Sequence, residues 1–182
     1  FRFEHYMNRY PFIKCWLPLL CGGLLLACAP VLKPALTGKP QAMLARAHFA
    51  AKDGAVLPVR GWWPPAGPLK AMVVALHGFN DYGRAFEAPG QYLSQRGIAV
   101  IAYDQRGFGN APGRGLWAGA ARYTADLKEI IAQLRRQHPG VPVHVLGESM
   151  GGAVAIAALT GPSPPEVDGL ILSAPAVWSR DL

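Results

Sequence analysis

Residues 141–158 read VPVHVLGESMGGAVAIAA, and this stretch decides the fold. An apolar run is followed directly by the pattern Gly-x-Ser-x-Gly, in which Ser149 lies between Gly147 and Gly151, and then by small residues suited to a helix. A strand that turns sharply into a helix brings backbone segments close together, which favours residues without a Cβ. We therefore expect a nucleophile elbow, a tight strand-to-helix turn that exposes Ser149 at the N-terminus of a helix.

Further apolar runs of strand length alternate with segments that can form helices. An uninterrupted apolar run of this length is typical of a strand buried on both faces of a sheet. Strands that alternate with helices pair in parallel through right-handed crossovers. The sequence therefore predicts an α/β fold with a mostly parallel sheet and helices on both faces. The expected strands are residues 71–76, 98–103, 141–146 and 170–173, and the expected helices are residues 85–96, 123–137 and 150–159.

A β-hairpin is expected before the first parallel strand. Two apolar-rich runs, residues 44–51 and 55–63, flank a turn that contains Asp53 and Gly54, a pair that favours tight hairpin turns. Pro58 interrupts the second run and has no backbone N–H to donate to a neighbouring strand. We therefore expect this strand at the edge of the sheet.

His77, Gly78 and Phe79 follow the expected strand at residues 71–76. A serine that attacks a carbonyl needs two N–H donors where the oxyanion forms, and the backbone N–H of Met150 supplies one of them. The other should come from the loop after the first parallel strand, so we expect the Phe79 N–H there, with Gly78 permitting close approach. His77 has two open interpretations: it shapes this loop, or it is a strand-end histidine with satisfied ring nitrogens.

Two polar residues near these motifs have structural interpretations. His144 lies inside an expected buried strand, where we predict a histidine of the core. Asp104 lies in the segment YDQRGFG, residues 103–109. The acid of a hydrolase triad follows the nucleophile in chain order in such sheets, whereas Asp104 precedes Ser149. We therefore predict a structural Asp–Arg loop at Asp104.

Residues 77–79, 103–109 and 147–152 follow three expected strands in this order, and as a set they resemble the α/β-hydrolase superfamily, closely its monoacylglycerol lipase and lysophospholipase branch. The resemblance covers the chain from residue 44 onward. It implies a serine hydrolase of lipid-derived carboxylic esters, such as a monoacylglycerol or a lysophospholipid, that uses no metal and no cofactor. The implied site residues are Ser149 as nucleophile, the backbone amides of Met150 and Phe79 as oxyanion donors, and His77, Gly78, Gly147 and Gly151 as supporting loop residues.

The resemblance breaks off after the expected strand at residues 170–173. In that family a lid, an acid and then a histidine follow the nucleophile, whereas the residues after Ser149 contain the acids Glu166, Asp168 and Asp181 and no histidine. A serine hydroxyl without a base is a poor nucleophile. We therefore expect the N-terminal portion of a hydrolase domain, without the lid, acid and histidine strands and without turnover alone. The alternatives are a binding protein without catalysis, and an acyltransferase or peptidase on the same fold.

The first residues have the features of an export signal. Met7 is the natural start of such a signal, so we interpret residues 1–6 as sequence translated from upstream of it. Arg9 and Lys14 precede an apolar run that is too short to span a bilayer as a helix. Residues 7–27 therefore have the pattern of a signal peptide.

Cys28 is a candidate lipid anchor. The preceding residues, Leu25-Leu26-Ala27, together with Cys28 resemble a bacterial lipobox, in which the cysteine carries acyl chains that hold the protein on a membrane. The alternative is ordinary secretion with cleavage near Ala27 or Ala29. We expect an exported, lipid-anchored protein of the bacterial envelope. In this interpretation residues 28–42 are the tether and residues 43–182 the hydrolase domain.

Composition and charge exclude other classes of protein. The 182 residues are 51% apolar and 16% charged, which excludes an intrinsically disordered chain. Lys and Arg number 18 and Asp and Glu number 11, a net charge of +7, and the basic residues are scattered, so no nucleic-acid partner is expected. Cys15, Cys21 and Cys28 are the three cysteines, so the expected domain has neither a disulfide framework nor a thiolate metal site.

Overall fold

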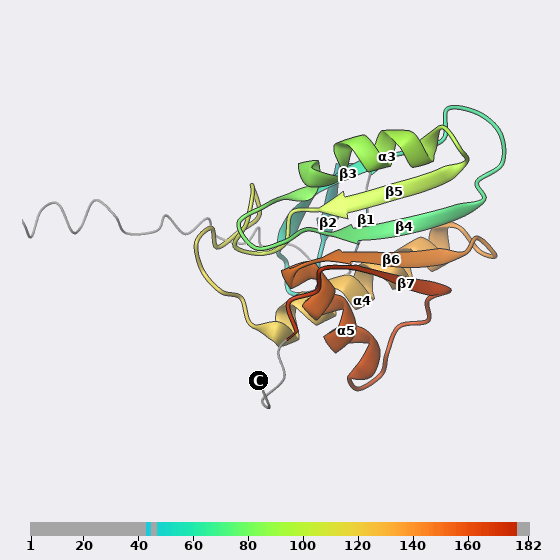
Figure 1. Ribbon diagram of the computed structural model, residues 1–182. Helices are drawn as coiled ribbons and strands as arrows, with labels where there is room; N and C mark the ends of the chain where they lie inside the picture. The colour runs from blue at the N-terminus through green and yellow to red at the C-terminus, as the bar shows by residue number, and fades with distance from the viewer. Residues whose placement is uncertain (1–42, 45–46, 178–182) are drawn as a thin grey trace, which may run out of the picture. The chain divides into compact units, whose positions relative to one another are not determined.

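A sheet with helices on both faces makes up most of the computed structural model, which describes residues 43–44 and 47–177 (Figure 1). The predicted leader, Cys28 and the tether lie outside the described residues. No helix within the described ranges is long and apolar enough to cross a membrane. The strands are β1 Met43–Leu44, β2 His48–Ala50, β3 Val56–Trp62, β4 Ala71–Leu76, β5 Ile98–Tyr103, β6 Val143–Glu148 and β7 Gly169–Ser173. The helices are the 3-10 turn η1 Gly83–Phe86, α3 Glu87–Ser94, α4 Ala120–Gln137 and α5 Met150–Thr160.

The seven strands lie in the order β1-β2-β3-β5-β4-β6-β7. Each neighbouring pair from β1 to β5, namely β1-β2, β2-β3 and β3-β5, is antiparallel. The pairs β5-β4, β4-β6 and β6-β7 are parallel. In the centre of the parallel part, Val74 of β4 is opposite Ile101 of β5 on one side and Val145 of β6 on the other. The parallel strands with helices on both faces confirm the predicted α/β class.

The strand order reverses at β4. The chain leaves β4 for β5 through α3, and it returns through α4 to β6 on the other side of β4. Helix α3 lies on one face of the sheet, while α4 and α5 lie on the other (Figure 1). In such sheets ligands bind beyond the carboxyl ends of the strands, at the position where the order reverses. Residues 77–82, which follow β4, therefore lie where a ligand site is expected.

Alternate residues of the central strands enter two separate cores. Val74 and Ile101 belong to the larger core, which includes the buried faces of α4 and α5. Val73 and Val100 belong to a smaller core with Phe86, on the face that α3 covers. Because both faces of β4 and β5 are buried, their sequences are continuous apolar runs, as predicted.

Several boundaries differ from those expected. The segment predicted as one helix at residues 85–96 forms η1 and then α3, and α4 begins before the predicted residue 123. The first strand of the predicted hairpin is divided into the short strands β1 and β2. The prediction that β3 is an edge strand is wrong, because β3 lies between β2 and β5.

Pro58 is tolerated in β3 because the partner of the strand changes there. It is opposite His48 of β2, and the pairing of β3 with β5 begins one residue later, at Val59. The Pro58 carbonyl oxygen still accepts a hydrogen bond from the Asp104 N–H at 2.9 Å, just beyond the end of β5. The missing N–H therefore costs no regular pair with β5.

Candidate active site

Ser149 lies on a sharp turn between β6 and α5, as the sequence predicts. Its backbone has φ 49° and ψ −114°, a combination that residues with a Cβ rarely adopt. Backbone hydrogen bonds hold the turn: the Ser149 N–H donates to the Ser173 carbonyl at 3.0 Å, and the Ser149 carbonyl accepts from the Ala153 and Ala176 N–H groups. The serine is thus fixed at the N-terminus of a helix, where developing negative charge is favoured.

The glycines around Ser149 are required by close backbone contacts. A Cβ on Gly147 would lie 2.6 Å from the Gly152 Cα, and a Cβ on Gly151 would lie 2.2 Å from the Leu76 carbonyl oxygen. Both distances are far below van der Waals contact, so neither position can carry a side chain without displacing the backbone. The Gly-x-Ser-x-Gly pattern therefore has a steric cause in this structure.

The loop after β4 approaches the same serine. A Cβ on Gly78 would lie 3.4 Å from the Ser149 Cβ and 3.9 Å from its Oγ, so the Gly78 backbone is a direct neighbour of Ser149. The next residue, Phe79, has a side chain that is 62% exposed. Among the described residues, neither the Phe79 N–H nor the Met150 N–H donates to a protein acceptor. The two amides that the sequence predicts as oxyanion donors are thus free to bind a ligand oxygen.

His77 connects this loop to the loop after β5. Its side chain is fully buried, and its Nε2 accepts a hydrogen bond from the Gln105 backbone N–H at 2.9 Å. Because Nε2 is the acceptor, Nδ1 carries the proton and donates to the Gly78 carbonyl oxygen at 2.8 Å. The Gln105 side-chain Nε2 in turn donates to the His77 carbonyl at 2.8 Å. His77 therefore shapes the loop with both ring nitrogens satisfied, so its two interpretations hold together.

The hydrogen bond to Gly78 also orients the peptide that contains the Phe79 N–H. The Gly78 carbonyl and the Phe79 N–H belong to one trans peptide unit and point in opposite directions. Because the carbonyl points at the His77 ring, the Phe79 N–H points away from it. Burial lowers the pKa of His77, and the hydrogen bond to Gly78 offsets this only in part. The neutral ring that this orientation requires is therefore the favoured form.

Asp104 has the structural role that the sequence predicts. It is fully buried, and its Oδ1 accepts from the Gly83 N–H and from the Arg60 guanidinium, both at 2.9 Å. Its Oδ2 accepts from the Asn110 N–H at 2.9 Å. The partner arginine is not Arg106 of the same loop but Arg60 on β3, and no local pattern in the sequence indicates that pairing.

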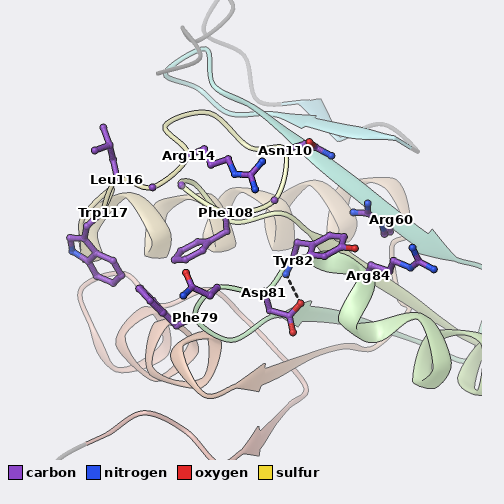
Figure 2. A pocket seen from close by; sticks show the side chains of 14 residues that line it. Arg60, Phe79, Asp81, Tyr82, Arg84, Phe108, Asn110, Arg114, Leu116 and Trp117 are labelled. Carbon is purple, nitrogen blue, oxygen red and sulfur yellow. Dashed lines mark hydrogen bonds between the residues drawn. The ribbon is translucent and has the colours of Figure 1, made fainter. Parts of the chain in front are cut away.

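A cavity of about 790 Å³ opens beside Phe79 (Figure 2). Its walls come from the loop after β4, the loop after β5 and Arg60 of β3. Its volume lies in the range of small-molecule sites, and such sites occur where the strand order of an α/β sheet reverses. The cavity therefore extends the candidate site on the side of Phe79.

Comparison with known families agrees with this geometry. The family model described as serine aminopeptidase, S33 matches residues 67–182, which include the loop after β4, the loop after β5 and the elbow. The chain belongs to this family. The S33 match confirms the α/β-hydrolase superfamily that the three motifs indicate.

Individual relatives of this S33 chain belong to the predicted branch. Monoglyceride lipase of Rattus norvegicus is 30% identical over 134 residues, which are 73% of this chain and 44% of the relative. Monoacylglycerol lipase of Mycolicibacterium smegmatis is 30% identical over 135 residues, 74% of this chain and 48% of the relative. A soluble variant of monoglyceride lipase from Saccharomyces cerevisiae, solved with a substrate analog, matches with a TM-score of 0.58 at 26% identity, over 81% of this chain and 48% of that chain. The chain thus spans less than half the length of these relatives.

No described histidine of the S33 chain can take the proton of Ser149. Both ring nitrogens of His77 are engaged as above. His144 lies near the start of β6, at the opposite end of the strand from Ser149. The prediction that His144 is a core residue is wrong: it is half-buried, because α3 covers β3 and β5 but not the same face of β6 and β7. His48 lies on β2, and His138 follows α4.

The described acids after Ser149 do not lie at the elbow either. Asp168 precedes β7. Its Oδ2 accepts one hydrogen bond from the Val143 N–H at the start of β6 and another from the Arg135 guanidinium on α4. The hydrogen bond from the Val143 N–H lowers the pKa of Asp168. Glu166 is exposed in the same connection, and Asp181 lies outside the described residues. Within residues 43–44 and 47–177, no group of three or more His, Cys, Asp or Glu side chains is arranged to hold a metal ion.

An ion-pair cluster that the sequence did not reveal supports the loop after β5. The Arg106 guanidinium donates to both carboxylate oxygens of Asp126 on α4, each at 2.7 Å, and to Asp53 in the hairpin turn at 2.7 and 2.9 Å. Arg122 also pairs with Asp53. Burial raises the pKa of Asp126, which the hydrogen bond from Arg106 partly offsets, whereas Arg106 lowers the pKa of Asp53. The cluster thus ties the hairpin, the β5 loop and α4 together.

Proposed function

We propose that this chain carries the nucleophile and the oxyanion donors of a serine hydrolase of carboxylic esters. The observation that carries the proposal is Ser149 on a strained turn, with the Gly78 backbone beside it and the amides of Met150 and Phe79 unpaired. Strained backbone persists only where the surrounding structure holds it, and it concentrates at functional sites. The two N–H groups without a protein acceptor are available to a ligand oxygen. An acyl carbonyl over Ser149 would satisfy both amides.

The reaction follows the chemistry of an acyl-enzyme. The Ser149 Oγ forms a bond to the ester carbonyl carbon as its proton passes to a base, and the carbonyl oxygen becomes an oxyanion. The Met150 and Phe79 N–H groups bind that oxyanion. Collapse of the tetrahedral intermediate breaks the ester C–O bond, and the protonated base gives its proton to the leaving alcohol. Water then attacks the acyl-serine by the same route, which releases the acid and restores Ser149.

The base in this mechanism is a histidine that lies outside the described residues. Every described histidine is either engaged by the loops or distant from the elbow, as shown above. We therefore propose that the 182 residues supply the nucleophile and the oxyanion donors, and that the acid and the histidine come from sequence beyond them. The 182-residue chain alone should show no turnover of esters.

A lipid-derived ester is the proposed substrate class. The relatives named monoglyceride lipase and monoacylglycerol lipase, and the resemblance to that branch, support a monoacylglycerol or a lysophospholipid. An acyltransferase or a peptidase on the same fold would use the same nucleophile with a different acceptor or acyl bond. The full-length protein should hydrolyse an ester faster than it hydrolyses the matching amide, and faster than it transfers the acyl group to glycerol. The reverse order of these rates overturns the ester assignment.

The decisive test is covalent labelling of the full-length protein with a fluorophosphonate, which reacts with activated serines. We expect labelling of the wild type and none of Ser149→Ala. Ser163→Gly is the matched control, because Ser163 is exposed in the loop after α5 and has φ 51°, which glycine adopts without strain; it should label like the wild type. No labelling of the wild type, or equal labelling of Ser149→Ala, would identify a binding protein without catalysis.

We also propose that Cys28 is lipidated and places the hydrolase on the bacterial envelope. The support is the Leu25-Leu26-Ala27-Cys28 pattern after a charged and apolar leader. Such an anchor would keep the site close to lipid substrates. Metabolic labelling with palmitate in a bacterial host should give a labelled wild type and an unlabelled Cys28→Ser, with Cys21→Ser as the control that stays labelled. An unlabelled wild type would favour ordinary secretion instead.

A further inference from the structure

The cavity beside Phe79 lies next to the loop that contacts the candidate nucleophile, Ser149. Phe79 forms part of its wall, and the preceding residue, Gly78, is the backbone neighbour of Ser149. If an ester carbonyl lies on Ser149 and the Phe79 N–H, one side of the substrate extends past Phe79 into this space. The side chains of the cavity therefore indicate what that side of the substrate contains.

One part of the cavity is apolar. The rings of Phe79 and Phe108 pack edge to face, with centroids 5.3 Å apart, and Leu116 and Trp117 line the wall near them, with 43% and 60% of their surface exposed (Figure 2). Exposed aromatic and aliphatic side chains in a cavity of this size suit the carbon skeleton of a substrate. This wall alone does not distinguish one ester from another.

The other part of the cavity is cationic. Arg60, Arg84 and Arg114 line it, whereas Asp81 is the one acidic residue among the lining residues. The Asp81 carboxylate accepts a hydrogen bond from the Tyr82 N–H at 2.8 Å. In Figure 2, Arg60 and Arg84 lie on the far side of Tyr82 from Phe79, while Arg114 lies between them and Leu116. The cavity thus has an apolar end at Phe79, the residue next to the Ser149 neighbour Gly78, and guanidinium groups farther from Phe79.

The arginines differ in how their charge is used. Arg60 pairs with the buried Asp104 and lies over the Tyr82 ring, 5.2 Å from its centroid. Arg84 pairs with Glu87 on the surface, where both side chains are largely solvated, so that this pair is weak. Arg114 is exposed and has no carboxylate partner among the described residues. Arg114 is therefore the guanidinium most available to an anionic ligand.

We propose that this cavity binds the phosphate group of the ester substrate, with Arg114 as the specificity-determining contact. The proposal rests on the proposed hydrolase function and names its substrate class as glycerol phosphate esters rather than neutral glycerides. A guanidinium donates two parallel hydrogen bonds to a phosphate, and Arg84 can turn from its solvated partner to the same group. A neutral monoacylglycerol would fill the apolar end and leave Arg114 without a partner.

The test compares two esters that differ only in the phosphate. The full-length protein is assayed with 1-hexanoylglycerol 3-phosphate and with 1-hexanoylglycerol, each below the concentration at which it forms micelles. We expect the ratio of the two kcat/KM values to favour the phosphate ester in the wild type. In Arg114→Gln this ratio should fall about tenfold, mainly through a higher KM for the phosphate ester, since a charged hydrogen bond is lost.

Matched variants separate this contact from general charge. Arg136→Gln removes one exposed positive charge from the last turn of α4, outside the cavity, and should keep the wild-type ratio. Arg114→Lys should recover part of the ratio, because lysine keeps the charge but not the paired hydrogen bonds. Because Arg114 is exposed and unpaired, its variants should unfold at the wild-type temperature, which thermal melting checks.

The outcomes separate the two proposals. If the fluorophosphonate labels Ser149 but Arg114→Gln keeps the wild-type ratio of kcat/KM values, the phosphate assignment is overturned and the hydrolase proposal stands. The same holds if the wild type prefers the neutral ester. A preference for an ester that carries a carboxylate in place of the phosphate also overturns it. Absence of labelling overturns both proposals, because no hydrolytic site would then exist for the cavity to serve.

Discussion

Two loops meet at the candidate active site, and they hold their shapes by different means. The elbow, residues 147–152, is held by backbone: Gly151 lies against the Leu76 carbonyl, and the Ser149 turn is closed by backbone hydrogen bonds. The loop at residues 77–82 is held by buried polar side chains: its own His77 ring bonds Gly78 and Gln105, and the Asp104 carboxylate bonds the Gly83 N–H directly after the loop. The first loop therefore depends on the absence of side chains, and the second on the presence of buried polar ones.

The largest effect that distinguishes them should come from adding one methyl group. Gly151→Ala places a Cβ 2.2 Å from a backbone oxygen of β4, and a backbone atom cannot move aside as a side-chain end can. We expect a loss of about 3 kcal/mol or more in the free energy of unfolding, enough to prevent folding of a marginal domain. Expression, solubility and urea unfolding measure it.

The same change in the other loop is the control. A Cβ on Gly78 would meet nothing closer than the Ser149 Cβ at 3.4 Å, an ordinary contact. Gly78→Ala should therefore fold, with a change of less than about 1 kcal/mol. If Gly151→Ala is as stable as Gly78→Ala, the elbow is not held by backbone packing.

The next effect should come from the buried carboxylate behind the side-chain-held loop. Asp104→Ala leaves the Gly83 and Asn110 N–H groups without an acceptor and removes the partner of Arg60. Removing one partner of a buried pair while its donors remain costs about 3 kcal/mol. Urea unfolding of the wild type and the variant measures this loss.

A surface pair provides the comparison for that loss. Glu87→Ala removes the partner of Arg84, but both of these side chains are largely exposed, so the unfolding midpoint should stay the same. An equal effect of the two substitutions would mean that Asp104 contributes no more than a surface charge, and that the loop after β4 is held in another way.

These differences explain what could be predicted from the sequence. The cause of the elbow is local, so the spacing of Gly147, Ser149 and Gly151 predicted it together with its strand and helix. The side-chain contacts join distant positions: His77 with Gln105, 28 residues apart, and Arg60 with Asp104, 44 residues apart. No period or motif links such pairs.

The same limit explains the two wrong predictions, for Pro58 on β3 and for His144 on β6. The edge position predicted from Pro58 failed because the rule concerns a strand with one partner along its length, whereas β3 changes partner at that residue. His144 was predicted as a core residue from the apolar strand around it, but its burial depends on which helix covers that face of β6. Both outcomes are decided by tertiary packing.

A third, smaller effect should appear as a pH dependence that only the side-chain-held loop shows. Burial lowers the pKa of His77 below the ordinary value of 6.5. Protonation of Nε2 would also turn this acceptor into a donor that faces the Gln105 N–H donor, so that their hydrogen bond is lost. The unfolded chain then binds a proton more readily, so the contribution of the neutral ring is complete above pH 6.5 and is lost as the pH falls toward the pKa of the folded state. The slope is at most about 1.4 kcal/mol per pH unit.

The measurement is urea unfolding of the wild type and of His77→Gln from about pH 8 to about pH 5. Glutamine keeps a polar side chain in the loop but does not titrate there, so the wild type should lose more stability than His77→Gln as the pH falls. Parallel curves for the two proteins would show that His77 titrates alike in the folded and unfolded chains, and would remove the argument that burial fixes its neutral tautomer.

The smallest effect should come from Ser149, the proposed nucleophile. Ser149 has φ 49° and ψ −114°, a backbone conformation that costs a residue with a Cβ about 1 kcal/mol or more and costs glycine little. Ser149→Ala removes the hydroxyl but keeps the strain, whereas Ser149→Gly removes both. We therefore expect Ser149→Gly to unfold at a higher urea concentration than Ser149→Ala, by about 1 kcal/mol, although glycine at an ordinary helix start would be the less stable of the two because of its unfolded-state entropy. The sign of this difference separates a strained elbow from a relaxed one: if Ser149→Ala is the more stable variant, the elbow stores no strain at Ser149, and the backbone contacts of Gly147 and Gly151 alone hold the serine in place.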